Sequence, residues 1–147
     1  MSVLALPSGF GYVALATVAT WVVHHGVMSI GVMQARKKYG VKFPTLYATE
    51  ADCKDETSRK TYNCVQRGHQ NSLENLPSFY ALLLTAGLKY PITASVAAAF
   101  YLVGRVFYFQ GYASGNPEKR MNGSFMYIGI FTLLGTSIKI AIDLLSQ

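Results

Sequence analysis

The sequence predicts an all-α integral membrane protein, built as a bundle of four transmembrane helices in one domain over residues 1–147. Hydrophobic residues make up 51% of the 147 residues and charged residues only 14%, which is lean in charge for a soluble domain. The charged residues are also unevenly spread. Four stretches contain no Asp, Glu, Lys or Arg: 1–35, 75–88, 90–104 and 121–138.

These stretches have the length that a bilayer requires. A hydrocarbon core about 30 Å thick is crossed by roughly 20 apolar residues in a helix. The first and fourth stretches reach that length, and the other two reach it by including Glu74 and Arg105 at their ends. A soluble bundle of buried helices is disfavoured, because the four segments keep almost no polar face for water.

Breaks in the apolar pattern set the expected boundaries. The first segment lacks a basic start and is too long for a cleavable signal peptide, so Val3 to Val32 is expected to be retained. Pro44 lies in a polar loop, and Pro77 should kink the second helix. The expected helices cover residues 8–39, from Ser58 or Thr61 to Lys89, 92–113, and from Glu118 to the C-terminus.

Basic residues in the connections predict the orientation. Residues 36–60 hold seven Lys or Arg, and the connection before the fourth helix adds Lys119 and Arg120. The opposite side has only Lys89. Because basic loops stay in the cytoplasm, both basic loops are expected in the cytosol and both termini in the lumen. This distribution explains most of the net charge of +6 without a nucleic-acid partner.

Polar residues inside the helices form two sets, each on one helical face. The first set has spacing i, i+4, i+7 and the second i, i+3, i+7. The residues are Arg67, Asn71 and Glu74 in the second helix, and Arg105, Tyr108 and Tyr112 in the third. Ionisable residues in membrane segments suggest function, and this mixture suits a zwitterion with an extra carboxylate, such as a small acidic peptide. The alternative is an ion pair of Glu74 with Arg67 or Arg105 that only holds helices together.

The remaining polar residues indicate structural roles. His24 and His25 are adjacent and point in different directions, so a helix–helix hydrogen bond is expected rather than a chelating pair. Lys139 and Asp143 are expected to form an i, i+4 pair and snorkel. Two cysteines, Cys53 and Cys64, are expected to be reduced thiols, and the sequence has no zinc-type spacing, so no metal is expected.

Two segments resemble signatures of the MAPEG family, the membrane-associated proteins of eicosanoid and glutathione metabolism. The segment from Tyr62 to Glu74, which contains Val-Gln-Arg-Gly-His-Gln-Asn, resembles the helix-2 signature, and the segment from Gly104 to Tyr112 resembles the helix-3 signature. With Gly-Asn-Pro-Glu-Lys-Arg in the last loop, the chain is most similar to the microsomal glutathione S-transferase type 3 branch.

The resemblance implies a homotrimer whose glutathione sites lie between subunits and open to the cytosol. It implies glutathione contacts from the two polar sets, from an Arg36–Lys37 pair of the adjacent subunit, and from His69, which stands where leukotriene-synthesising members have a glutamine. Arg120 resembles the arginine that stabilises the glutathione thiolate, with Lys119 as the competing assignment. Asn75 stands where the leukotriene-synthesising members have a tyrosine, which again favours the type 3 branch.

The function implied is a glutathione transferase of the endoplasmic reticulum or another endomembrane. It would add the glutathione thiolate to hydrophobic electrophiles from the bilayer, with possible lipid hydroperoxide reduction and leukotriene C4 synthase-like side activity. The expected partners are glutathione, the electrophile or hydroperoxide, membrane lipid and further copies of the chain. A non-catalytic lipid-binding scaffold is the alternative. A small transporter is a weaker one, because no inverted repeat is present.

Overall fold

The first part of the chain is one continuous helical column. The computed structural model describes residues 5–146, so the outermost part of the expected 1–147 domain, including Val3, lies outside the described residues. Helix α1 (Phe10–Trp21) continues into the π-helix η1 (Val22–Met28) and then α2 (Ser29–Tyr39), which ends at Gly40 with a left-handed φ of 71°. Gly tolerates this conformation without a Cβ penalty.

The rest of the described chain is also helical. A loop leads to α3 (Glu56–Glu74) and α4 (Leu76–Gly87), and a short turn leads to α5 (Pro91–Ala113). The last elements are the 3₁₀ helix η2 (Pro117–Gly123) and α6 (Met126–Leu145). No strand occurs within residues 5–146. The expected all-α fold is therefore confirmed.

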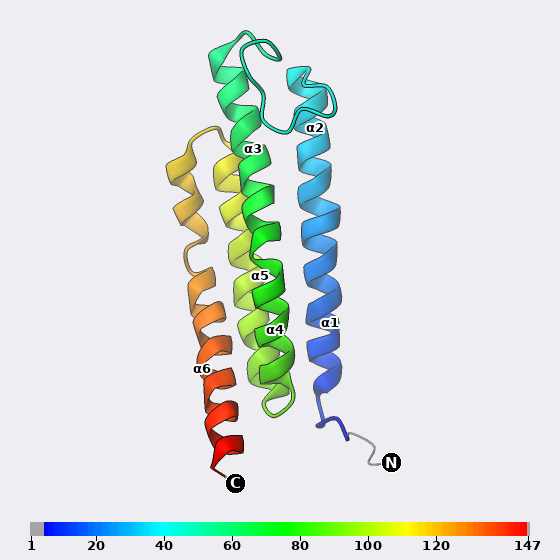
Figure 1. The fold of residues 1–147 in the computed structure, drawn as a ribbon, viewed down its shortest axis with the longest axis vertical. Coiled ribbons are helices and arrows are strands. Elements are labelled where there is room, and N and C mark those ends of the chain that lie inside the picture. Colours follow the sequence, from blue (N-terminus) through cyan, green and yellow to red (C-terminus); the bar gives the residue numbers. More distant parts are fainter. Residues whose placement is uncertain (1–4, 147) are drawn as a thin grey trace.

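The elements stand side by side along one long axis (Figure 1). The start of α1, the α4–α5 turn and the end of α6 lie at one end, and the α2–α3 loop lies at the other. Within residues 5–146, three helices are long and apolar enough to cross a membrane: Phe10–Tyr39, Pro91–Ala113 and Met126–Leu145. The expectation of four spans is thus met in part, because the second expected span is divided between α3 and α4.

That division lies at Asn75, two residues before Pro77. Pro77 has no N–H and cannot continue the helical hydrogen-bond ladder, and the backbone N–H of Asn75 bonds to Ser72 instead of Asn71. The side-chain amide of Asn75 then donates to the Asn71 carbonyl at 2.7 Å. The expected kink is therefore a break, in which a side chain replaces the missing backbone donor.

Two helix starts differ slightly from expectation. Helix α3 begins at Glu56 rather than at Ser58 or Thr61, because the Asp55 carboxylate accepts a hydrogen bond from the Ser58 backbone N–H at 2.7 Å. This is an N-cap, which satisfies one of the free donors of the first turn. The expected fourth helix opens as the 3₁₀ helix η2, and its α-helical part starts only at Met126.

Small residues bring η2 and α6 close to α5. A Cβ on Gly104 would stand 2.5 Å from the Met126 Cβ, and one on Gly111 would collide with the Lys119 carbonyl. Gly123 likewise lies against the Gly104 carbonyl and the Tyr108 backbone. Small residues permit such close helix approach in membrane proteins. The packing fixes Lys119 and Arg120 beside the C-terminal part of α5.

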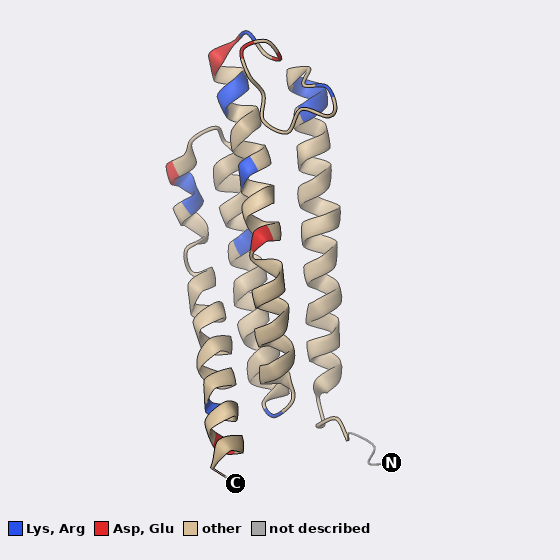
Figure 2. Ribbon diagram, in the orientation of Figure 1, with Lys and Arg blue, Asp and Glu red and all other residues tan. Residues whose placement is uncertain are grey.

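Charge gathers at the end of the bundle that carries the α2–α3 loop (Figure 2). Basic residues occur at the end of α2, along α3 and in η2, whereas at the opposite end charged residues occur in the α4–α5 turn and in α6. Asp143 accepts from Lys89 at 2.6 Å and from Lys139 at 3.1 Å. The distribution matches the uneven spread of basic residues that predicted the orientation.

Candidate functional site

Arg67 and Glu74 form an ion pair on the surface of α3. The Arg67 Nη1 donates to the Glu74 Oε1 at 2.8 Å, and the side chains are 41% and 46% exposed in the single chain. The seven-residue spacing explains the contact, because it places both side chains on one helical face. One of the two expected structural pairs is therefore present, and its atoms remain open to a ligand or a neighbouring chain.

Arg105 lies much deeper, between α5 and α3. It is only 3% exposed, and its Nη1 donates to the Asn71 Oδ1 at 2.9 Å. The guanidinium carbon lies 5.1 Å from the Tyr101 ring centroid and 5.4 Å from that of Tyr108. Within residues 5–146 no carboxylate pairs with it, so the alternative Arg105–Glu74 pair does not form.

Tyr108 and Tyr112 connect this buried arginine to η2. Their rings meet edge to face, with centroids 5.3 Å apart. The Arg120 guanidinium carbon lies 5.7 Å from the Tyr112 centroid, and the Arg120 Nη1 donates to the Pro117 carbonyl at 2.7 Å. Lys119 is exposed. Arg120 is thus the η2 cation that lies against the aromatic pair.

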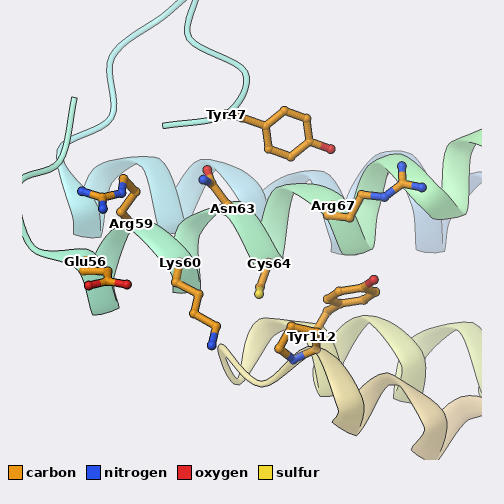
Figure 3. A pocket seen from close by; sticks show the side chains of 9 residues that line it. Tyr47, Glu56, Arg59, Lys60, Asn63, Cys64, Arg67 and Tyr112 are labelled. Carbon is orange, nitrogen blue, oxygen red and sulfur yellow. The ribbon is translucent and has the colours of Figure 1, made fainter. Parts of the chain in front are cut away.

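A groove of about 490 Å³ runs over this surface (Figure 3). Tyr47 from the α2–α3 loop stands on one side and Tyr112 on the other, and Pro117 also lines the groove. Helix α3 supplies the floor between them, with Glu56, Arg59, Lys60, Asn63, Cys64 and Arg67. Three of these side chains are basic and one is acidic, so the groove favours an anionic ligand.

The sequence reasoning placed only Arg67 and Tyr112 in this groove. Asn63 and Lys60 were missed, although they stand one and two turns before Arg67 on the same face, and this period could have revealed them. Tyr47 could not be found in this way, because a loop carries it. Asn71, Arg105 and Tyr108 lie next to the groove rather than in its lining.

Arg36 is occupied within its own chain. It is 9% exposed, and its guanidinium donates to the carbonyls of Lys42 at 3.3 Å and Thr45 at 2.6 Å. It also stacks against the Phe43 ring, with the guanidinium carbon 4.4 Å from the centroid. Lys37 is exposed beside it. The structure therefore gives these two neighbours different surroundings, and Lys37 is the one available to another chain.

His69 lies away from the groove. Its Nε2 is 3.0 Å from the His24 carbonyl and 3.3 Å from the Ser29 hydroxyl, so it connects α3 with η1. The His24 ring itself bonds to the Thr20 carbonyl at 2.8 Å. The expected helix–helix bond from the His24 ring does not form; instead its backbone oxygen, which the π-helical turn leaves accessible, accepts the bond from His69. His25 stacks on Trp21.

Hydrogen bonds lower the pKa of two carboxyl groups in the loop. The backbone N–H and hydroxyl of Thr49 and the hydroxyl of Thr45 hold the pKa of Asp52 below its usual value. The Ser58 hydroxyl and backbone N–H do the same for the pKa of Asp55. Both groups are therefore ionised at neutral pH. No group of three His, Cys, Asp or Glu in the described part of the chain is placed to hold a metal ion.

Comparison with known proteins identifies the family. The chain is 36% identical over 98 residues to an uncharacterized protein of Synechocystis sp., which covers 66% of this chain and 64% of that protein. It is 41% identical over 69 residues to microsomal glutathione S-transferase 2 of Mus musculus, and this match covers 46% of this chain and 46% of the mouse protein. The matches thus span less than two thirds of these relatives. The model of the MAPEG family matches residues 13–142, and the chain belongs to the MAPEG family.

Proposed function

We propose that this protein is a membrane-bound glutathione transferase and that the groove over α3 holds glutathione. The observation that carries the proposal is a preformed groove with Arg67 on its floor and Tyr112 on its wall. Glutathione brings two carboxylates and one ammonium. Arg67 suits a carboxylate as a bidentate partner, and Glu74 suits the ammonium. Family membership and the mouse relative support the same activity.

The proposed assembly is a homotrimer of four-crossing subunits. Helices α3 and α4 would together form the second of the four crossings, with a polar first half near the cytosolic surface. The exposed position of the Arg67–Glu74 pair supports a site completed by a second copy. Lys37 of that copy is exposed and would supply a further cation, with Arg36 holding the loop beside it. His69 would act by fixing α3 on η1.

The proposed chemistry is attack of the glutathione thiolate on a hydrophobic electrophile. A sulfur–carbon bond forms, and the electrophile accepts the electron pair or releases its leaving group. A thiol with a pKa of about 8.5 is mostly protonated at neutral pH, so a nearby cation that lowers this pKa accelerates the reaction. Arg120 is the proposed cation, because it lies against Tyr112 at the edge of the groove.

The same thiolate could serve a second reaction at this site. Reduction of a lipid hydroperoxide would consume two glutathione molecules and yield the alcohol, water and glutathione disulfide. Hydrophobic substrates of either kind would arrive from the bilayer. The proposed location is the endoplasmic reticulum or another endomembrane with the groove in the cytosol. Protease added to sealed vesicles should then cut the α2–α3 loop and spare a C-terminal tag.

A thiolate titration tests the proposal. Glutathione binding is first measured by equilibrium dialysis, and thiolate formation is then followed by its near-ultraviolet absorbance as pH rises. Arg120→Ala should shift the thiolate signal upward by roughly one to two pH units and lower turnover, with little change in affinity. Arg120→Lys should recover part of the effect.

The results of this titration distinguish between the residues that could stabilise the thiolate. A shift with Lys119→Ala but not with Arg120→Ala would give the role to Lys119. No shift in either variant would direct the test to Arg105. Absence of glutathione binding by the unmodified protein would contradict the proposal and favour the lipid-binding scaffold.

A further inference from the structure

The wall of the groove opposite Tyr112 comes from an unusually well-fixed piece of loop. We call residues 42–52 the strap. Residues of α2 and α3 hold its backbone: Arg36 at the carbonyls of Lys42 and Thr45, the Tyr62 hydroxyl at the Leu46 carbonyl (3.2 Å), and Asn63. A surface loop with this many side-chain anchors is restrained before any ligand arrives.

Asn63 makes the most specific of these anchors. Its side-chain oxygen accepts from the Ala48 backbone N–H at 2.8 Å, and its side-chain amide donates to the Ala48 carbonyl at 3.0 Å. Both backbone groups of one residue are thus held by one side chain of α3. Ala48 directly follows Tyr47, so these two bonds fix the point from which the Tyr47 ring extends.

The Tyr47 side chain has its own anchor. Its hydroxyl donates to the Gln70 Oε1 of α3 at 2.5 Å, and its ring lines the groove. Figure 3 shows Tyr47 and Tyr112 on opposite sides of the α3 floor. Gln70 is one turn beyond Arg67, so the anchor lies next to the proposed carboxylate partner.

We propose that Tyr47 is a ligand-binding residue of the groove and that Gln70 is its positioning residue. This inference rests on the proposed function. The strap supplies a preorganised wall, so that bound glutathione contacts Tyr47 on one side and Tyr112 on the other. Preorganisation raises affinity because the free protein loses less freedom on binding. The wall acts on affinity and leaves thiolate formation, which depends on the cation at the other side, unchanged.

Glutathione affinity and turnover of purified protein in detergent test this wall. Tyr47→Ala should raise the Kd and KM for glutathione about tenfold, with kcat and the pH of thiolate formation unchanged. Tyr47→Phe and Gln70→Ala should each raise the Kd about two- to tenfold, the range for loss of one hydrogen bond. The double variant Tyr47→Phe/Gln70→Ala should bind glutathione no more weakly than either of these two single variants, because each substitution removes the same hydrogen bond.

Tyr12→Phe is the matched control, since Tyr12 is exposed on α1 far along the chain from the groove and should leave the Kd unchanged. The strap keeps its Arg36, Tyr62 and Asn63 anchors in every variant, and thermal unfolding midpoints check folding. A Kd within twofold of the unmodified protein for Tyr47→Ala would overturn the inference alone. Failure of the unmodified protein to bind glutathione would overturn it together with the proposed function. Additive losses in the double variant would exclude Gln70 as the positioning residue.

Discussion

Two polar regions meet on α3 within two helical turns, and they differ in depth. The surface region is the Arg67–Glu74 pair, with both side chains more than 40% exposed. The buried region is the Arg105–Asn71 pair between α5 and α3, with Arg105 only 3% exposed. Arg67 already has a carboxylate partner and can exchange it for a ligand, whereas Arg105 has an amide and two aromatic rings. The difference supports the proposed binding role of the first region and a structural role for the second.

The largest expected effect is on stability, from Arg105→Ala. The change leaves the Asn71 Oδ1 without its donor and opens a space between the Tyr101 and Tyr108 rings. An unsatisfied buried polar group costs about 1–3 kcal/mol, and the cavity adds to it. We expect a loss of about 2–4 kcal/mol, measured by denaturant unfolding in detergent. Arg105→Lys should recover little, because an ammonium lacks the planar fork.

Removal of the surface arginine is the matched comparison. Arg67→Ala should cost at most about 1 kcal/mol in stability, because exposed ion pairs contribute little. It should instead abolish most of the glutathione affinity. If Arg67→Ala destabilises the protein as much as Arg105→Ala does, the division into a binding pair and a structural pair is wrong.

A second large effect is expected where η2 contacts α5. A Cβ at Gly111 would collide with the backbone of Lys119 and stand 2.8 Å from the Arg120 nitrogen. Backbone atoms cannot rotate away, so η2 must shift, and such overpacking costs about 1–3 kcal/mol. Gly111→Ala should lower both the unfolding midpoint and turnover, because Arg120 moves with η2.

Gly135→Ala provides the control for that experiment. Gly135 lies within α6, and nothing stands within 4 Å of a Cβ built there. Replacement of a helical Gly by Ala is favourable by about 0.5–1 kcal/mol when there is space. Unchanged turnover in Gly111→Ala would show that the position of η2 does not control the thiolate.

A smaller effect on stability, but a specific one on binding, is expected for Glu74→Gln. Stability should change by at most about 1 kcal/mol, because the pair is exposed. Glutathione affinity should fall roughly tenfold, since a charged partner for the ammonium is lost. Glutathione with an acetylated amine should bind the variant and the unmodified protein equally. If both compounds lose the same affinity in Glu74→Gln, Glu74 does not contact the ammonium.

The sequence predicted the helices, and which residues share a helical face, better than it predicted how deeply each side chain is buried. Charge-free runs and helical spacing correctly indicated an all-α chain and placed Arg67 and Glu74 within bonding distance. The same spacing could not show that Arg105 is buried and Arg67 exposed, because depth depends on which helices pack together. The close approach of η2 to α5 depends on glycines of α5 and η2 that face the other segment. Which glycines face it is known only once the register between the two segments is known.

Local hydrogen bonding was the second source of error. Pro77 correctly indicated an interruption, but the break falls at Asn75 because its side chain can satisfy the Asn71 carbonyl. The resemblance gave His69 as a glutathione contact, and spacing alone could not show that its ring bonds to the His24 carbonyl of the π-helix. The Tyr47 wall was missed because the path of a loop does not follow from residue spacing.

The smallest expected effect lies in the strap, at Asp52. Asp52 accepts bonds from Thr45 and Thr49, and these bonds hold its pKa below the usual value. A depressed pKa means that the folded state favours the carboxylate, so this stabilisation is complete at neutral pH. The stabilisation is lost as the pH falls from about 4, the usual pKa of an Asp side chain, through the lowered pKa of Asp52. Hydrogen exchange of the Thr49 amide, corrected for its intrinsic rate, should therefore quicken in that range.

Asp52→Asn should quicken the same exchange at neutral pH and remove its pH dependence, because the amide carries no charge to lose. Glu50→Gln is the control, since Glu50 is exposed in the same loop and should leave the exchange unchanged. The Tyr47–Gln70 bond and the Asn63 anchor do not involve Asp52, so the groove wall should persist when Asp52 is protonated. Loss of glutathione affinity in Asp52→Asn at neutral pH would instead mean that Asp52, rather than Asn63, fixes the position of Tyr47.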